Sequence, residues 1–113
     1  MCIRDRSAAE DIEAIAAVEG LDVCFVGPAD LTRSLGFMGQ HDVPRTAAVV
    51  EPLAAKVRSV GKAKLGIPAF HYNYERDEQA LVNLGFRLIT CGSDLSTLLK
   101  GFRENLKRTA EVR

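Results

Sequence analysis

The regular alternation of helical patterns with short apolar runs is the feature that most restricts how this chain can fold. Apolar runs occur at residues 23–26, 63–68 and 86–91, and a segment with the helical spacing of apolar residues lies on each side of every run. Runs of this length, bounded by turn residues, are typical of buried strands. Strict alternation implies a parallel sheet with right-handed crossover connections, so the sequence predicts an α/β fold.

Four segments have the spacing of helices, and their expected bounds are residues 7–18, 44–60, 75–84 and 95–110. In the first segment, Ser7 and Glu10 form the pattern of a capping box, in which each side chain bonds a free backbone N–H group. In the second segment, Pro52 predicts either a kink or a helix that begins at about Glu51. Residues 32–41 fit neither pattern and are expected to form a long loop that lines or covers a site.

The last helical segment has one apolar stripe and one charged face. The stripe consists of Leu95, Leu98, Leu99, Phe102 and Leu106, and the charged residues opposite it are Lys100, Arg103, Glu104, Lys107 and Arg108. A stripe of this kind packs against another surface. That surface belongs either to the same domain or to a neighbouring subunit, and the sequence leaves both alternatives open.

Three predicted strands are too few for a closed sheet. An isolated parallel sheet of three strands would leave both of its edges exposed, which folded proteins avoid. A barrel of eight βα units needs about 250 residues, whereas this chain has 113. The chain is therefore either a very small open α/β domain or, as we expect, part of a larger barrel whose remaining strands it lacks.

Residues 1–6 differ from the rest of the chain. They have no apolar period and join abruptly to the first helical segment. We expect them to be a non-native start that does not belong to the fold. Residues 7–113 are then one portion of a single barrel domain.

Charge and cysteine usage restrict the partners of the chain. Fifteen basic and fifteen acidic residues give a formal net charge of zero, which argues against binding to nucleic acid or to an anionic membrane. No stretch approaches the roughly 20 apolar residues that span a bilayer, and the N-terminus lacks the apolar core of a signal peptide. Cys2, Cys24 and Cys91 are widely spaced and are expected to be free thiols. We expect a cytoplasmic protein whose partners are small molecules or other chains.

Residues 23–31 carry the strongest indication of a site. The apolar run stops at Gly27-Pro28 and places one carboxylate, Asp30, just beyond the carboxyl end of the predicted strand. Ligands of parallel α/β folds bind at this end of the strands. An Asp in this position is also common as a helix cap or turn residue, so the pattern alone leaves both roles open.

Several blocks of the sequence occur together, in order and at compatible spacing, in one enzyme family. They lie at residues 12–22, 25–31, 35–37, 39–41, 61–62, 66–67, 84–86, 92–94 and 98–99. The most specific of them contains Gly-Pro-Ala-Asp-Leu at residues 27–31. In these blocks the chain resembles the HpcH/HpaI aldolases, which are metal-dependent (class II) aldolases of 2-keto acids. The resemblance implies the C-terminal part, the last three βα units, of a (β/α)8 TIM barrel of the phosphoenolpyruvate-mutase-like superfamily.

The resemblance also implies a site for a metal and a substrate. In the family a divalent metal, Mg²⁺ or Mn²⁺ and sometimes Co²⁺, is held by one Glu and one Asp and binds the 2-keto acid. Asp30 matches the Asp ligand, and Pro68 matches an apolar wall of the pocket. The backbone around Gly27, Ala29 and Asp30 matches the groups that hold the substrate carboxylate. By the family spacing the Glu falls near Arg4, where this chain has no Glu; the family's general-base His and substrate-binding Arg come from earlier strands and are missing.

Structural roles are favoured for the other polar residues near the predicted strand ends. Asp94 is expected to be the N-cap of the last helix, although Gly92 and Ser93 can still shape the floor of the pocket. Arg33 and Gln40, in the expected long loop, are weaker candidates for contact with a substrate. His41 is expected to have a structural role, and a surface-loop role is favoured for His71 over that of a base.

The function implied by the resemblance is cleavage of a 4-hydroxy-2-oxo acid to pyruvate and an aldehyde by a metal-dependent carbon–carbon lyase. One alternative is a lyase of the citrate-lyase β-chain type, which acts on thioesters; the sequence has no evident basic pocket for a coenzyme A phosphate. Another is a non-catalytic fragment that only associates with other chains. The family exchanges its final helix between subunits and forms hexamers, so a homo-oligomer is expected. This chain alone is expected to be inactive, because most of the catalytic residues are missing.

Overall fold

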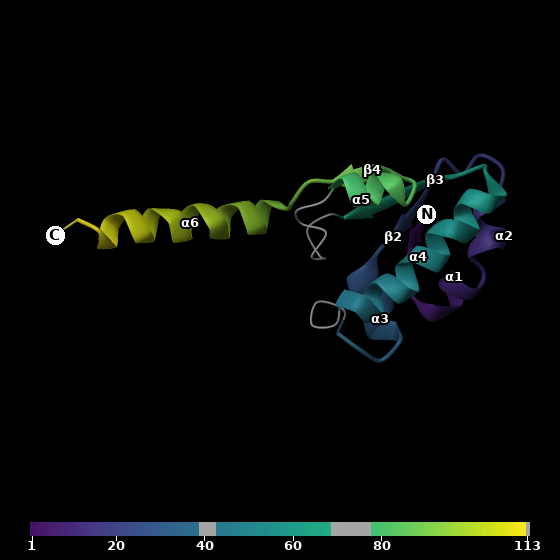
Figure 1. Cartoon of the computed structure of the whole chain (residues 1–113), viewed down its shortest axis with the longest axis horizontal. Helices are drawn as coiled ribbons and strands as arrows, with labels where there is room; N and C mark the ends of the chain where they lie inside the picture. The colour runs from purple at the N-terminus through teal and green to yellow at the C-terminus, as the bar shows by residue number, and fades with distance from the viewer. Residues whose placement is uncertain (39–42, 69–77, 113) are drawn as a thin grey trace.

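The computed structural model describes residues 1–38, 43–68 and 78–112. In this part of the chain the strands form one sheet in the order β1-β2-β3-β4, and every neighbouring pair is parallel. The strands are β1 (Cys2–Ile3), β2 (Val23–Val26), β3 (Lys64–Pro68) and β4 (Phe86–Thr90). The predicted parallel α/β fold is confirmed, with one more strand than expected (Figure 1).

Helices precede and follow the strands along the chain. They are α1 (Arg6–Glu10), α2 (Ile12–Ala16), α3 (Pro28–Ser34), α4 (Val43–Val60), α5 (Glu78–Asn83) and α6 (Asp94–Ala110). α2 and α4 lie against each other, whereas α6 extends away from the sheet (Figure 1). The start of the third expected helix, residues 75–77, lies outside the described part. None of the described helices is long and apolar enough to cross a membrane.

The core lies on one face of the sheet, between the strands and the helices. The strand residues buried there, each at most 1% exposed, are Ile3, Cys24, Val26, Leu65, Ile67 and Phe86. The helical residues packed against them are Ile12, Ala16, Leu31, Val50, Leu53, Ala54, Val57 and Leu81. Complete burial of a large aliphatic or aromatic side chain contributes about 1.5–3 kcal/mol, so this face holds the sheet and the helices together.

The opposite face of the sheet is open. Phe25, Gly66, Leu88 and Thr90 lie on this face because they alternate along their strands with residues that face the core. Leu88 is 45% exposed although it lies within a strand. In a closed barrel the corresponding face points to the interior. An exposed apolar side chain here therefore fits a sheet that is one part of a barrel.

Part of the segment at residues 1–6 belongs to the sheet, which corrects the expectation that all of it lies outside the fold. The Phe25 N–H donates to the carbonyl oxygen of Met1 at 2.8 Å, and the Gly27 N–H donates to that of Ile3 at 2.9 Å. Ile3 is fully buried. The edge of β2 needs backbone hydrogen-bond partners, and a short extended segment with one apolar side chain supplies them. That the segment is a non-native start stays a prediction.

α3 occupies the start of the expected long loop, so that expectation is wrong up to Ser34. Pro28 lies in the first turn, where its missing N–H group has no cost, and Leu31 is fully buried. The helix has only 7 residues, and Gly27 alone separates it from β2. A helix this short does not show a clear apolar period, so the sequence pattern did not predict it. Gln40 and His41, at the end of the expected loop, lie outside the described residues.

Two further helices differ from their expected form. The N-cap of α1 is Asp5 rather than Ser7, because Asp5 Oδ1 accepts a hydrogen bond from the Ala8 N–H at 2.9 Å. α4 continues through Pro52, so the alternative of a helix that begins near Glu51 is wrong. Apolar residues of α4 on both sides of this proline are buried in the core, and their burial outweighs the lost backbone hydrogen bond.

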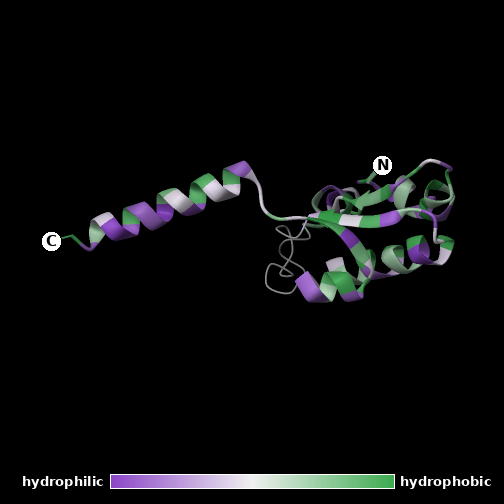
Figure 2. Ribbon diagram, turned by 90° about the horizontal axis from the view of Figure 1, so that it is seen from above, coloured by the Kyte–Doolittle hydropathy of each residue, from purple (hydrophilic) through white to green (hydrophobic). Residues whose placement is uncertain are grey.

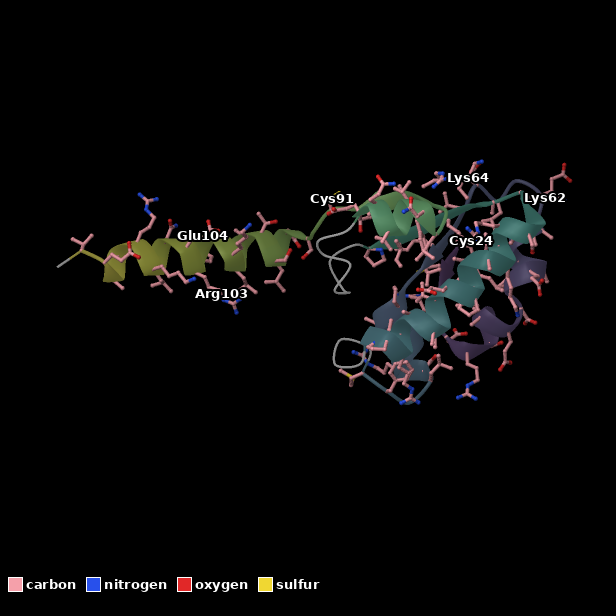
Figure 3. The ribbon with its side chains drawn as sticks, in the orientation of Figure 1. Cys24, Lys62, Lys64, Cys91, Arg103 and Glu104 are labelled. Carbon is pink, nitrogen blue, oxygen red and sulfur yellow. The ribbon has the colours of Figure 1, made fainter. Side chains whose placement is uncertain are left out.

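α6 begins with a capping box whose N-cap is Ser93 rather than Asp94. Ser93 Oγ accepts from the Ser96 N–H at 3.2 Å, and Ser96 Oγ accepts from the Ser93 N–H at 3.0 Å. None of the 17 residues of this helix is buried, and Figure 3 shows Arg103 and Glu104 projecting away from it in opposite directions. The extents of the chain, 61 × 28 × 21 Å, reflect the protruding helix.

The apolar stripe of α6 is uncovered along its whole length. Its side chains are between 45% and 70% exposed, and Figure 2 shows α6 standing apart from the other elements of the described chain. No described residue covers this stripe, and both surfaces that the sequence left open for it, the rest of the same domain and a neighbouring subunit, stay open.

The three cysteines are free thiols, as expected. Cys24 lies between the sheet and the helices, whereas Cys91 follows β4 at the surface (Figure 3). Burial raises the pKa of the Cys24 thiol, and the N-terminal ammonium group lowers it by less. Cys24 is therefore protonated and shielded, and it acts as a small apolar residue of the core.

Gly66→Ala is expected to lower the free energy of unfolding by about 1–3 kcal/mol. A Cβ atom at this position would lie 2.6 Å from Phe25 Cδ2 and 3.1 Å from Val23 Cγ1, so the ring or the strand must move. Urea unfolding followed by circular dichroism measures the change. Gly101→Ala is the matched control, because a Cβ there meets nothing within 4 Å and Ala favours a helix over Gly. Equal losses in the two variants would contradict this packing.

In the native protein, Cys2 and Cys91 are expected to react at once with a disulfide reagent such as dithiobis(nitrobenzoate), and Cys24 only after denaturant is added. Exposure of the first two thiols and burial of the third are the reason. The absorbance of the released thiolate measures the two phases. Cys24→Ser should remove the slow phase alone; three rapid thiols in the native chain would show that the core is open.

Candidate functional site

A pocket with a volume of about 450 Å³ opens at the carboxyl edge of the sheet. It is lined by all four residues that the sequence analysis assigned to the substrate, which are Gly27, Ala29, Asp30 and Pro68. The remaining lining residues are Cys2, Arg4, Phe25, Pro28 and Thr90. The predicted residues are therefore gathered in one place.

The parallel sheet explains why these residues converge. β2, β3 and β4 end at Val26, Pro68 and Thr90, and Pro68 pairs with Thr90 in register. Strands that run in the same direction place their carboxyl ends at the same edge. α3 begins two residues after β2 ends, so its first turn, with Ala29 and Asp30, lies at this edge as well.

Gly27 joins the strand to the first turn of α3. A Cβ atom at Gly27 would lie 3.1 Å from Arg4 Cγ. A larger residue at Gly27 would therefore push against the segment that contains Arg4. The Gly27 carbonyl oxygen accepts the first helical hydrogen bond, from the Leu31 N–H at 3.0 Å. The N–H groups of Ala29 and Asp30 precede this bond and have no carbonyl partner within the helix. They are backbone donors at the wall of the pocket.

Asp30 presents an open carboxylate. Its side chain is 51% exposed, and its charged neighbour is Arg33, whose Nη1 lies 3.8 Å from Asp30 Oδ1. An ion pair this exposed contributes at most about 1 kcal/mol, so Asp30 can exchange this partner for another cation. Arg33, which the sequence analysis considered as a substrate contact, lies further along α3 and does not line the pocket.

The described residues do not by themselves form a site for a divalent metal. Asp30 is the one acidic residue in the described lining of the pocket, and no group of three or more His, Cys, Asp or Glu side chains gathers anywhere in the described part. Mg²⁺ requires near-octahedral oxygen coordination, usually with one or two carboxylates together with water and substrate. Arg4 lines the pocket where the family spacing places a Glu, and its positive charge disfavours a cation there.

Two further candidates, Gly92 and Ser93, do not line this pocket. Ser93 uses its hydroxyl group to cap α6. The remaining candidates, Gln40, His41 and His71, lie outside the described residues.

Five lining residues were not predicted to contact the substrate, and two of them, Phe25 and Thr90, lie on strands that the sequence did predict. Alternation within each strand was the signal available for both. Phe25 lies between the buried residues Cys24 and Val26, and Thr90 follows Ile89, which packs against the core. Residues that face inward at the carboxyl ends of barrel strands are well placed to carry a site.

A second hollow, of about 500 Å³, lies among the helices and shares no lining residue with the first. Arg45 stacks over the ring of Phe37, with Cζ 4.1 Å from the ring centroid. Arg6 and Lys56 add positive charge to its rim. Since it contains no residue from the end of a strand, it is not part of the predicted site.

Known proteins resemble this chain in sequence. The model of the HpcH/HpaI aldolase/citrate lyase family matches residues 3–101. The chain is similar to the hydroxypyruvate/pyruvate aldolase of Agrobacterium fabrum, with 37% identity over 98 residues that cover 87% of this chain and 35% of that protein. It is also similar to the 4-hydroxy-2-oxo-heptane-1,7-dioate aldolase of Salmonella paratyphi B, with 31% identity over 99 residues, 88% of this chain and 36% of that protein.

A solved structure resembles the chain in fold. The crystal structure of a HpcH/HpaI aldolase/citrate lyase family protein from Burkholderia cenocepacia J2315 superimposes with a TM-score of 0.80 and 32% identity, over 97% of this chain and 41% of that one. This chain thus spans little more than a third of the length of the curated relatives. These matches confirm both the family resemblance and the prediction of a partial barrel.

Proposed function

Because the chain belongs to the HpcH/HpaI aldolase/citrate lyase family, we propose that it is part of an aldolase that cleaves a 4-hydroxy-2-oxo acid to pyruvate and an aldehyde. The observation that carries this proposal is the gathering of Gly27, Ala29, Asp30 and Pro68 around one pocket at the carboxyl edge of the sheet. The names of the two aldolase relatives support this reaction class. The missing strands belong to the remainder of the same barrel.

The reaction divides the substrate between its C3 and C4 atoms. The C3–C4 bond breaks, its electron pair moves to C3 and the ketone as an enolate, and the C4 hydroxyl loses its proton as C4 becomes the aldehyde. A proton added at C3 gives pyruvate. In this proposal the N–H groups of Ala29 and Asp30 donate to the substrate carboxylate, and Pro68 bounds the pocket as an apolar wall. The general base comes from the missing strands.

Metal dependence is a second part of the proposal. Asp30 would supply one ligand to Mg²⁺ or Mn²⁺, or to Co²⁺, and a Glu from outside residues 7–113 would supply another. The open, half-exposed carboxylate of Asp30 at the pocket supports this role. A divalent cation held there would supply positive charge that stabilises the enolate formed during cleavage.

A citrate-lyase β-chain-like lyase is the alternative within the same family. Such an enzyme acts on a thioester, and a coenzyme A phosphate needs a cluster of cationic side chains. Arg4 is the one cation in the described lining of the pocket, so the 2-oxo acid aldolase is favoured. A non-catalytic fragment is the other alternative, and the assay below separates all three.

We also propose that the active protein is a homo-oligomer in which α6 packs on a neighbouring copy. The stripe of Leu95, Leu98, Leu99, Phe102 and Leu106 is 45% to 70% exposed, and α6 has the length of a complete helix of 17 residues. An apolar stripe left in water is unfavourable at about 25 cal/mol per Å². A second copy of the same chain offers the same stripe in self-complementary form.

Asp30→Asn is expected to lower kcat/KM at least about 100-fold in a complete barrel, as loss of a metal ligand does. The test uses a chimera in which residues 7–113 replace the matching part of the Agrobacterium fabrum relative, so that the relative supplies the missing strands. Pyruvate release from a 4-hydroxy-2-oxo acid is measured with and without EDTA. Asp22→Asn, at the opposite end of β2, is the matched control and should retain activity.

The chimera assay also separates the alternatives. EDTA is expected to abolish pyruvate release and added Mg²⁺ or Mn²⁺ to restore it, and activity unaffected by chelation would refute the metal assignment. Cleavage of a thioester in place of the 2-oxo acid would favour the citrate-lyase type. The 113-residue chain alone should release no pyruvate; activity of that chain would show that the missing strands are not required.

Phe102→Asp is expected to weaken self-association by roughly 30-fold or more, because it places a charge at the centre of an apolar contact. Size-exclusion chromatography with light scattering, over a range of concentrations of the 113-residue chain, measures the association. Arg103→Asp, on the charged face of the same helix, is the control and should leave association unchanged. A wild-type chain that stays monomeric at high concentration would rule out this interface.

A further inference from the structure

Thr90 is the last residue of β4 and one wall of the pocket. It pairs with Pro68 across β3 and β4. Its neighbour Ile89 packs against the core, so strand alternation turns Thr90 to the open face on which the pocket lies. Its side chain is half-buried, and its direction is set by the strand rather than by a mobile loop.

The hydroxyl group of Thr90 has no hydrogen-bond partner in the described part of the chain. Several hydroxyl groups of the described residues donate to a backbone carbonyl oxygen close by: Thr32 to Ala29 at 3.3 Å and Thr97 to Ser93 at 2.8 Å are examples. No buried side-chain oxygen or nitrogen of the described residues lacks a partner, so the Thr90 hydroxyl is reached by solvent from the pocket and can bond a group that enters it. A polar group of a ligand in the pocket is one such group.

Thr90 lies at the end of the pocket away from Asp30. Asp30 follows β2 and Thr90 ends β4, with β3 and Pro68 between them. Neighbouring strands are about 4.8 Å apart, so the two strands are separated by roughly 10 Å. In the proposed binding mode the substrate carboxylate lies at the first turn of α3, and the part of the pocket bounded by Pro68 and Thr90 is then left for the other half of the substrate.

We propose that Thr90 is a specificity-determining residue that hydrogen-bonds a hydroxyl group on the aldehyde half of the substrate. This inference rests on the proposed aldolase function and names the substrate class more closely, as aldehydes with a hydroxyl group on the carbon next to the carbonyl. Pro68 and Phe25 leave the rest of this wall apolar, so Thr90 is the side-chain hydroxyl in the described lining. A site that bonds a substrate hydroxyl discriminates against the analogue that lacks it.

The test uses the same chimera in the direction of synthesis, with pyruvate and either glycolaldehyde or acetaldehyde. These two aldehydes differ in one hydroxyl group. Thr90→Val keeps the shape of the side chain and removes its hydroxyl. It is expected to lower kcat/KM for glycolaldehyde by about 10-fold, the effect of one hydrogen bond, and to leave kcat/KM for acetaldehyde unchanged.

Two controls separate hydrogen bonding from packing. Thr90→Ser keeps a hydroxyl and should restore the preference for glycolaldehyde. Thr97→Val, on α6 and outside the pocket, should leave the ratio of the two kcat/KM values unchanged.

Each outcome decides the proposal. A ratio that is the same in Thr90→Val and in the unsubstituted chimera, with both aldehydes accepted, would overturn the role of Thr90 and leave the aldolase function intact. Equal losses for both aldehydes would assign Thr90 to packing alone. A chimera inactive toward both aldehydes, and toward the cleavage substrate, would overturn the proposed function and this inference with it.

Discussion

Burial of one face of the sheet under α2 and α4 is the interaction from which the arrangement of the site follows. Cys24 and Val26 of β2 lie on this face together with Leu65 and Ile67 of β3. A slip of one residue in either strand would turn these side chains to the open face, so burial fixes the register. The register in turn fixes where each strand ends. The first turn of α3 and the ends of β3 and β4 therefore meet at one pocket, although they are far apart in sequence.

The parallel fold and most of the site could be predicted from the sequence because both depend on local patterns. Apolar runs bounded by turn residues predicted β2, β3 and β4, and the position of Asp30 after β2, with the family resemblance, predicted the pocket. α3 was not predicted, because it is stabilised by burial of Leu31 and its sequence has no repeating apolar pattern. β1 was not predicted, because a strand of two residues is too short to show an alternating pattern. It forms by pairing with the edge of β2. Thr90 was overlooked because its role depends on which face of β4 is covered.

Two apolar surfaces of the described chain lack a cover, and they differ in kind. Leu88 is exposed on the open face of the sheet, where a closed barrel would bury it within the same domain. The stripe on α6 lies on a helix that extends away from the described sheet (Figure 1). The first surface fits a sheet that is one part of a barrel, and no described residue covers the second.

The short distance between β2 and α3 fixes the backbone N–H groups at the wall of the pocket. Gly27 accepts the first hydrogen bond of the helix, and Leu31, one turn later, is fixed in the core. The N–H groups of Ala29 and Asp30 are held between these two anchors. Their orientation is set when the chain folds, so a ligand that binds them meets donors that have already lost their conformational freedom. The entropy cost of aligning them belongs to folding and not to recognition.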